Sequence, residues 1–235
     1  MTPKVLRLLS GGAAHGLVAS LAPQFKAMTG LDIDGEYSAV GAMAAKLEAG
    51  EAADLVVLTR AIVAGLAAKG LVAADTIADL GLVETSIAVR SGDPPVSTAD
   101  AASLRNALLA ADEIFVPDTK TSTAGIHVAR VLDRLDIAGE VAGRLRVYAN
   151  GATAMRQLAA SGAARAIGCT QATEIIGTPG VRLCDPLPAG FELATVYTAA
   201  VTARSGQSEA AKRLIALLTA ADSRVLRANA GFLEV

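Results

Sequence analysis

The sequence has no tryptophan, and its aromatic residues together amount to only 3%. Single-stranded nucleic acids and many sugars are bound on aromatic stacking surfaces, so neither ligand is expected. Basic residues are not in excess either, since 21 Lys and Arg face 23 Asp and Glu for a net charge of −2. A nucleic-acid-binding domain carries a basic footprint, and no nucleic-acid partner is therefore expected.

Cysteine and histidine are equally scarce, with two of each. Cys169 and Cys184 are too few for a disulfide framework, and the sequence leaves their redox state open. Two dispersed histidines without a His-Glu-x-x-His motif predict no metal site. The sequence also lacks the Gly-x-Ser-x-Gly, phosphate-loop and Cys-x-x-Cys motifs, and Gly11-Gly12 does not continue into dinucleotide-binding spacing. No cofactor is therefore predicted.

No apolar run approaches the 18 residues of a membrane-spanning helix, so membrane insertion is not expected. The first ten residues lack the apolar core and cleavage site of a signal peptide, and they indicate a first β-strand. The location stays open: cytoplasmic if Met1 is native, periplasmic if a signal peptide was removed. With 235 residues, 52% of them hydrophobic, the chain is long enough for one large core or two modest ones. A monomer is favoured, although the sequence does not determine the oligomeric state.

Strand-like and helix-like runs alternate along the chain, which is typical of an α/β fold with parallel strands. In residues 14–29, Leu17, Leu21, Phe25 and Met28 form a helical stripe. The first series of expected elements comprises strand Val5–Leu9, helix 14–29, strand Leu31–Tyr37, helix 41–50, strand Asp54–Thr59, helix Ala61–Lys69 and strand Glu84–Arg90.

A second series follows the linker-like segment Ser91–Pro95. It comprises a helix near 99–111, strand Ile114–Pro117, helix 123–135, strand Leu145–Tyr148, helix 152–161, strand Ala166–Thr170, strand Leu193–Ala203 and a helix within 207–229. Two series predict two doubly wound, three-layer α/β lobes joined by two crossover strands. The expected lobes are residues 1–84 with 196–235, and residues 85–195.

Four strand-to-helix junctions contain mostly small residues. Such residues let the backbone approach a ligand, and a helix N-terminus presents unpaired N–H groups to an anion. Ligands of open α/β sheets bind beyond the carboxyl ends of the strands, where these junctions lie. The candidate ligand-binding residues at the junctions are Ser10, Gly11, Gly12 and Ala13; Ser38, Val40 and Gly41; Ser122, Thr123 and Ala124; and Asn150 and Ala152.

Over nearly its whole length the sequence resembles the molybdate-binding branch of the type 2 periplasmic binding proteins. The most specific stretch joins Phe25-Lys26…Gly30-Leu31-Asp32 to Leu47-Glu48-Ala49-Gly50…Ala53-Asp54-Leu55, similar to the family pattern QFKxxxG(V/I)xV…xIExGxxADLF. Thr123–Ile126 resembles the family's PAGIYA helix start, and Ala166–Gly168 resembles its LGIVYxTDA strand. The resemblance implies two lobes that close on a small anion.

The sequence departs from this family where the family binds its oxyanion. Its molybdate binders place serine hydroxyls at the first two junctions. They also have a tyrosine directly after the GIV residues of the LGIVYxTDA strand. The matching positions here fall on Ala13, on Ala39–Gly41 and on Gln171. A compact tetrahedral dianion needs several short hydrogen bonds from such hydroxyls. The departures therefore favour a small organic di- or tricarboxylate over molybdate.

Three basic residues near the junctions are candidates for holding a carboxylate. Arg60 follows a strand directly and offers a planar guanidinium fork, although a solvated surface position is the alternative. Arg90 and Lys120 are further candidates. The two histidines, His15 and His127, lie at the starts of helices in opposite lobes, where either a surface role or proton transfer is open.

Three functions remain open from the sequence. The first is a solute-binding clamp, which would serve an ABC importer if the protein is exported. The second is an isomerase, because aconitate isomerase resembles the same group and implies allylic proton transfer on a tricarboxylate. His15 and His127 would then be the catalytic residues, with Glu174 as the next base to test. The third is an effector-sensing domain, although no helix-turn-helix segment accompanies it.

Overall fold

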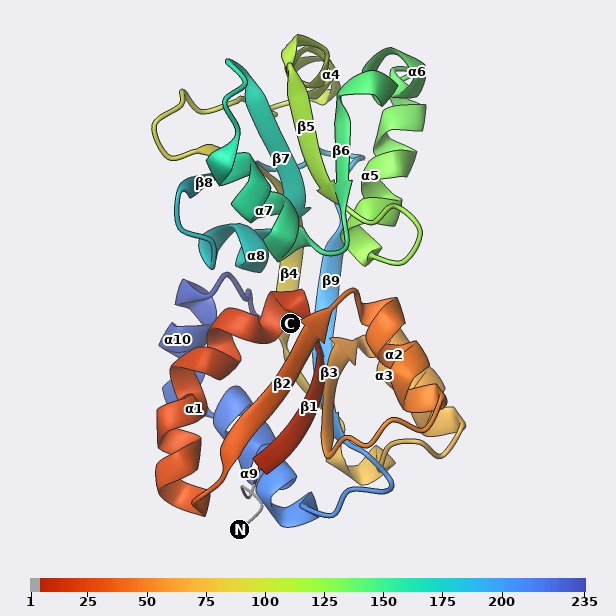
Figure 1. Cartoon of the computed structure of the whole chain (residues 1–235), viewed down its shortest axis with the longest axis vertical. Helices are drawn as coiled ribbons and strands as arrows, with labels where there is room; N and C mark the ends of the chain where they lie inside the picture. The colour runs from red at the N-terminus through yellow and green to blue at the C-terminus, as the bar shows by residue number, and fades with distance from the viewer. Residues whose placement is uncertain (1–4) are drawn as a thin grey trace. The chain divides into compact units, whose positions relative to one another are not determined.

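The computed structural model describes residues 5–235 and divides the chain into two units (Figure 1). Unit 1 runs up to Val83 and resumes at Thr195, and unit 2 comprises Glu84–Ala194. The chain passes from one unit to the other within strand β4 (Ala78–Arg90) and at the start of strand β9 (Ala194–Val201).

Unit 1 is a sheet in the strand order β2-β1-β3-β9 with helices on both faces. Helix α1 contacts α9, and α2 contacts α3. The elements in chain order are β1 (Val5–Gly11), the 3₁₀ helix η1 (Gly12–Ala14), α1 (His15–Thr29), β2 (Asp32–Ser38), α2 (Val40–Glu48), β3 (Leu55–Thr59), α3 (Arg60–Ala68), η2 (Ala74–Thr76), the first part of β4, most of β9, α9 (Ser208–Thr219), η4 (Ala221–Ser223) and α10 (Arg224–Asn229).

The register of unit 1 brings three strand ends to one edge of the sheet. β1 runs parallel to both β2 and β3, with Gly11 opposite Ser38 and Ser10 opposite Val57. Strands β1, β2 and β3 therefore end together, and each leads into a helix. The α1 stripe packs Leu17, Leu21 and Phe25 into the core, whereas Met28 in the last turn is 49% exposed. Gly30 ends α1 in the left-handed conformation that glycine adopts without strain.

Unit 2 is a sheet in the order β4-β7-β5-β6, with β8 paired to β4. β5 runs parallel to β6 and β7, so these three strands also end at a shared edge. The elements in chain order are the second part of β4, α4 (Ala101–Ala110), β5 (Glu113–Pro117), α5 (Thr123–Arg134), α6 (Ala138–Val141), η3 (Ala142–Arg144), β6 (Leu145–Tyr148), α7 (Gly151–Ala160), β7 (Ala166–Gln171), α8 (Ala172–Ile176) and β8 (Val181–Pro186).

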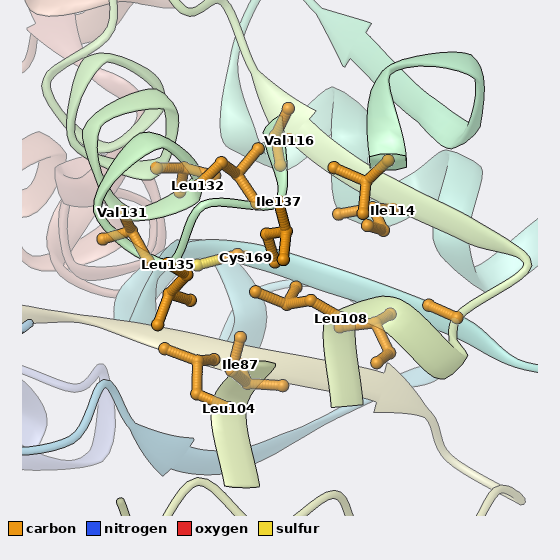
Figure 2. Close-up of a cluster of buried hydrophobic side chains, with 14 of the residues drawn as sticks. Ile87, Leu104, Leu108, Ile114, Val116, Val131, Leu132, Leu135, Ile137 and Cys169 are labelled. Atoms are coloured by element: carbon orange, nitrogen blue, oxygen red, sulfur yellow. The ribbon is translucent and has the colours of Figure 1, made fainter. Parts of the chain in front are cut away.

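Neighbouring residues of β5 pack into opposite faces of the unit 2 sheet, as the two-residue period of a strand requires. Ile114 and Val116 enter the cluster of Figure 2, together with Leu104 and Leu132. Phe115 enters a second cluster with the α7 residues Ala154, Met155 and Leu158. Burial of each large apolar side chain stabilises the fold by about 1.5–3 kcal/mol. Two apolar clusters on two faces make unit 2 a three-layer α/β/α arrangement.

The α/β class predicted from the sequence is confirmed, and the parallel pairing that it implies holds for β1 with β2 and β3 and for β5 with β6 and β7. β9 runs antiparallel to β3, and β4 runs antiparallel to β7 and β8. Parallel neighbours are usually joined by a helical crossover. β4 and β9 instead carry the chain from one unit to the other, so they are not joined to these neighbours in that way. Strand β8 was not predicted, because its mostly exposed residues show no clear alternation.

Candidate functional site

The first junction of unit 1 brings its backbone close to neighbouring side chains. A Cβ atom at Gly11 would lie 2.7 Å from Val40 Cγ1 and 3.0 Å from a ring carbon of Tyr197, so no larger residue fits there. Ser10 is fully buried, and its hydroxyl donates to the carbonyl of Gly11 at 2.9 Å. Gly12 and Ala13 form the short η1 helix that leads into α1. This junction therefore offers a ligand its backbone rather than the Ser10 hydroxyl.

The second junction leaves the start of α2 without a side-chain cap. Ala39 holds the N-cap position and has no side-chain group to accept from the first turn, which begins with Val40 and Gly41. Ser38, directly before it, is half-buried. Uncapped N–H groups at a helix start attract anions. The junction therefore retains the property for which the sequence suggested it.

Arg60, the first residue of α3, is held by Asp79 in an ion pair. Arg60 Nε donates to Asp79 Oδ1 at 3.2 Å, and Nη2 donates to Oδ2. The buried hydroxyl of Thr198 donates to the same Oδ1 at 2.6 Å. The hydrogen bonds from the Arg60 guanidinium and from Thr198 lower the pKa of Asp79 below its ordinary value. Arg60 therefore lies at the carboxyl end of β3 and binds a carboxylate of the same chain through Nε and Nη2.

His15 begins α1 and is exposed. Its ring lies edge-on to the Tyr37 ring, with centroids 4.6 Å apart at 71°. Tyr37 lies on β2 one residue before Ser38, and burial raises its pKa to about 12. His15 therefore lies at the carboxyl edge of unit 1 beside a phenol that stays protonated at neutral pH.

In unit 2, Ser122 caps α5 with its side-chain oxygen, which accepts from the Gly125 N–H at 3.5 Å. Thr123 and Ala124 form the first turn of this helix. His127, in the second turn, lies 2.8 Å from the carbonyl oxygen of Phe191 through Nε2. A carbonyl oxygen only accepts, so Nε2 carries the hydrogen and Nδ1 of the neutral ring keeps its lone pair.

The start of α7 is filled by a carboxylate of the same chain. Asn150 caps this helix, accepting from Thr153 N–H at 2.8 Å. The buried Glu174 carboxyl accepts from the N–H groups of Gly151 and Ala152, and from the Thr170 hydroxyl at 2.6 Å. Burial raises the pKa of Glu174, and these donors oppose the rise. In this structure the anion-binding groups of the fourth junction therefore hold Glu174.

The residue that replaces the family's tyrosine has a buried amide with no partner. Gln171 ends β7 and is 2% exposed, and within residues 5–235 neither its Nε2 nor its Oε1 has a hydrogen-bond partner. Thr85, opposite Gln171 in the β4–β7 register, has an equally unpartnered buried hydroxyl, as does Thr173. Side chains directly opposite each other in an antiparallel pair lie on one face. Leaving such groups unpaired costs about 1–3 kcal/mol each, so this cluster at the carboxyl edge of unit 2 is suited to a polar ligand.

The other two basic candidates differ in their contacts. Arg90 pairs with Asp93 and donates to the carbonyl of Ser161 at 2.5 Å. Lys120 is exposed, in a loop whose backbone is fixed by the Asp118 carboxylate. The Arg90 contacts lie before the start of β7, away from Gln171, whereas Lys120 follows β5 at the edge of unit 2 where β7 ends.

A hollow of unit 1 lies at the opposite edge of its sheet. It has a volume of about 830 Å³ and is lined by residues that include Val5, Arg7, Asp54 and Lys69. These lie at the amino ends of β1 and β3 and at the end of α3. Ligands of open α/β sheets bind at the carboxyl ends, so size does not make this hollow the site.

Residues 5–235 lack two kinds of feature. No group of three or more His, Cys, Asp or Glu side chains is arranged to hold a metal ion. No helix in this part of the chain has both the length and the hydropathy to span a bilayer.

Both units are α/β sheets whose parallel strands end at small-residue junctions, and open α/β sheets bind their ligands at such strand ends. The sequence matches the bacterial extracellular solute-binding proteins over residues 6–233, and the chain belongs to that family. The periplasmic molybdate-binding protein of Azotobacter vinelandii has a similar fold, with a TM-score of 0.80 at 16% identity, covering 98% of this chain and 99% of that one. The sulfate-binding protein SubI of Mycobacterium tuberculosis H37Rv gives a TM-score of 0.76 at 20% identity over 99% and 87%.

Among curated proteins, the aconitate isomerase of a Pseudomonas species is 27% identical over 224 residues, which cover 93% of this chain and 83% of that protein. These similarities confirm the resemblance to type 2 periplasmic binding proteins that the sequence motifs indicated.

The hydrogen-bond partners around Arg60 and the residue opposite Gln171 are distant from Arg60 and Gln171 in sequence and were not predicted. Asp79 and Thr198 lie 19 and 138 positions after Arg60, and Thr85 lies 86 positions before Gln171. Only the pairing of β4 and β9 with their neighbours brings them into place. The acidic residue of the family's TDA motif was a signal for Glu174, which matches it in Ala172-Thr173-Glu174.

Proposed function

We propose that the protein binds a small organic di- or tricarboxylate through polar groups at the carboxyl edges of its sheets. The observation that carries the proposal is the buried Gln171 amide, unpartnered within residues 5–235 and opposite the Thr85 hydroxyl. Hydrogen bonds from a ligand to this amide and to the hydroxyls would stabilise the complex. The same buried groups destabilise the protein when they have no hydrogen-bond partner.

The donor set favours a carboxylate over a tetrahedral oxyanion. Ala13, Ala39–Gly41 and Gln171 stand where the molybdate-binding pattern has two serines and a tyrosine, which removes three hydroxyl donors. Arg60 supplies a planar fork that matches a carboxylate in geometry as well as charge. If the protein is exported, an ABC importer is the partner that its family suggests.

Calorimetric titration tests the proposal. Wild-type protein is titrated with molybdate, sulfate, tricarballylate and trans-aconitate, and the Gln171→Leu variant is titrated in parallel. A tricarboxylate should bind in preference to both oxyanions, and Gln171→Leu should weaken it about tenfold or more, because a leucine of similar size makes no hydrogen bond. Nanomolar molybdate binding, or no binding of any carboxylate, would overturn the proposal.

A second candidate function is isomerisation of a tricarboxylate, favoured by the similarity to aconitate isomerase along most of the chain. The reaction removes a proton from one allylic carbon, shifts the double bond and adds a proton at the other end. His127 is suited to accept a proton, because its Nδ1 lone pair is available while Nε2 holds the Phe191 carbonyl. His15 is the second candidate for proton transfer.

Proton exchange in D₂O, followed by NMR on cis- and trans-aconitate, tests this activity. Replacing the catalytic histidine by asparagine should lower turnover by about 10²–10⁴-fold. Exchange that survives replacement of both His15 and His127 would move the assignment to Glu174. No exchange with any acid that binds would leave the protein a binding clamp.

A further inference from the structure

The ion pair with Asp79 occupies one edge of the Arg60 guanidinium group, and a second edge remains available to a ligand. Asp79 accepts from Nε and Nη2, which is the side-on edge of the fork. A guanidinium group has five N–H donors, so three remain, two on Nη1 and one on Nη2. Among the described residues no acceptor other than Asp79 bonds to these nitrogens, and the Arg60 side chain is 51% exposed. The remaining donors form the end-on edge, which matches the two oxygens of one carboxylate.

A further hydrogen bond, from Thr198, fixes the Asp79 carboxylate. Thr198 lies on β9 with no exposed surface, and its hydroxyl donates to Asp79 Oδ1 at 2.6 Å. Asp79 lies near the start of β4, so two strands fix the carboxylate that holds the arginine. A long arginine side chain loses conformational entropy when it binds a ligand, and prior fixation reduces that loss.

We propose that Arg60 binds a ligand carboxylate through its end-on edge and that Asp79 and Thr198 position it. The inference rests on the proposed function, because it assigns the residue that selects carboxylates at the edge of unit 1. Asp79 and Thr198 act through Arg60, so they are positioning residues.

Charge alone predicts the opposite effect for Asp79. Its carboxylate repels an anionic ligand, so by Coulomb attraction alone Asp79→Asn should strengthen binding. If Asp79 positions the fork, the same variant should weaken binding. The sign of the change in affinity therefore separates the two effects: weaker binding indicates positioning, and tighter binding indicates charge repulsion.

The experiment is a calorimetric titration of full-length variants with trans-aconitate, and with sulfate as the non-planar comparison. Arg60→Lys should weaken trans-aconitate about tenfold or more, because an ammonium group lacks the planar fork. Asp79→Asn and Thr198→Val should each weaken it about three- to tenfold, since Arg60 keeps its charge but loses its fixation. Thr198→Ser keeps the hydroxyl and should bind as wild type does.

The matched control is Asp112→Asn, which removes an exposed carboxylate from an ion pair with Arg165 in unit 2. It should leave affinity unchanged, and thermal melts should show every variant folded. Tighter or unchanged binding in Asp79→Asn, or equal losses for trans-aconitate and sulfate in Arg60→Lys, would overturn the inference while the proposed function stands. If wild-type protein binds no carboxylate, the proposed function and this inference fail together. The wild-type titration is therefore done before those of the variants.

Discussion

The close approach of Gly151 to Glu174 makes a sharp prediction about stability. A Cβ atom at Gly151 would lie 1.9 Å from Glu174 Oε2 and 2.1 Å from Thr170 Oγ1. Both distances are far below contact, so Gly151→Ala must separate two groups that share a 2.6 Å hydrogen bond. Overpacking a core costs about 1–3 kcal/mol, and leaving a buried polar group unpaired costs about 1–3 kcal/mol. We therefore expect the free energy of unfolding to fall by about 3 kcal/mol.

A matched glycine elsewhere makes the test specific. Gly65 lies in helix α3, is exposed, and has nothing within 4 Å of a built Cβ. Gly65→Ala should therefore stabilise the protein by about 0.5–1 kcal/mol, because alanine loses less conformational entropy in a helix. Urea unfolding followed by far-UV circular dichroism measures both changes.

The refuting result is a Gly151→Ala variant as stable as wild type, or stabilised like Gly65→Ala. A third variant tests the cause. In Gly151→Ala combined with Glu174→Ala, the added methyl group meets no carboxyl, so the combined loss should be smaller than the sum of the two single losses. Additive losses would show that the carboxyl of Glu174 is not what Gly151 makes room for.

Three further predictions follow from burial and backbone conformation. Burial raises the pKa of Glu174 from 4.5, so the native state holds this proton more tightly than the unfolded chain does; stability should fall as pH rises from about 4.5 through the raised value, and pH-dependent melts of Glu174→Gln should lack this fall. Burial also raises the pKa of Cys169 to about 12, so in Cys184→Ser a thiol reagent should show no reaction until urea is added. Gly81 has φ +152° and a built Cβ would lie 2.7 Å from the Leu233 carbonyl oxygen, so Gly81→Ala should lower the melting temperature, with a loss of about 1–3 kcal/mol.

Local sequence pattern predicted the bounds of some elements closely. Strand Leu145–Tyr148 has the bounds expected from the sequence, and helix 123–135 differs from α5 by one residue. The expected strand Glu84–Arg90 was too short, because β4 begins at Ala78 with half-buried residues that show no alternation. Pairing was less predictable than the elements, since antiparallel β4 and β9 depend on contacts far apart in sequence.

The candidate site shows the same division. Small-residue junctions identify the carboxyl edges, because close backbone approach demands them at positions such as Gly11. The internal partners of charged residues carry no local signal: Asp79 reaches Arg60, and Glu174 reaches Gly151, only once the sheets have formed. The sequence could therefore suggest where an anion binds, but not which donors the chain already uses for itself.

The order of strands in unit 1 has a consequence for synthesis. β9 pairs with β3, whose residues Leu55–Leu58 are completely buried, yet about 135 residues separate the end of β3 from the start of β9. Unit 2 is a continuous segment and emerges whole before β9 does. During synthesis the residues of unit 2 therefore all precede the residues of β9 that pair with β3, and until β9 emerges the apolar strand β3 lacks this neighbour. The sheet of unit 1 can therefore be completed only after all of unit 2 has been synthesised.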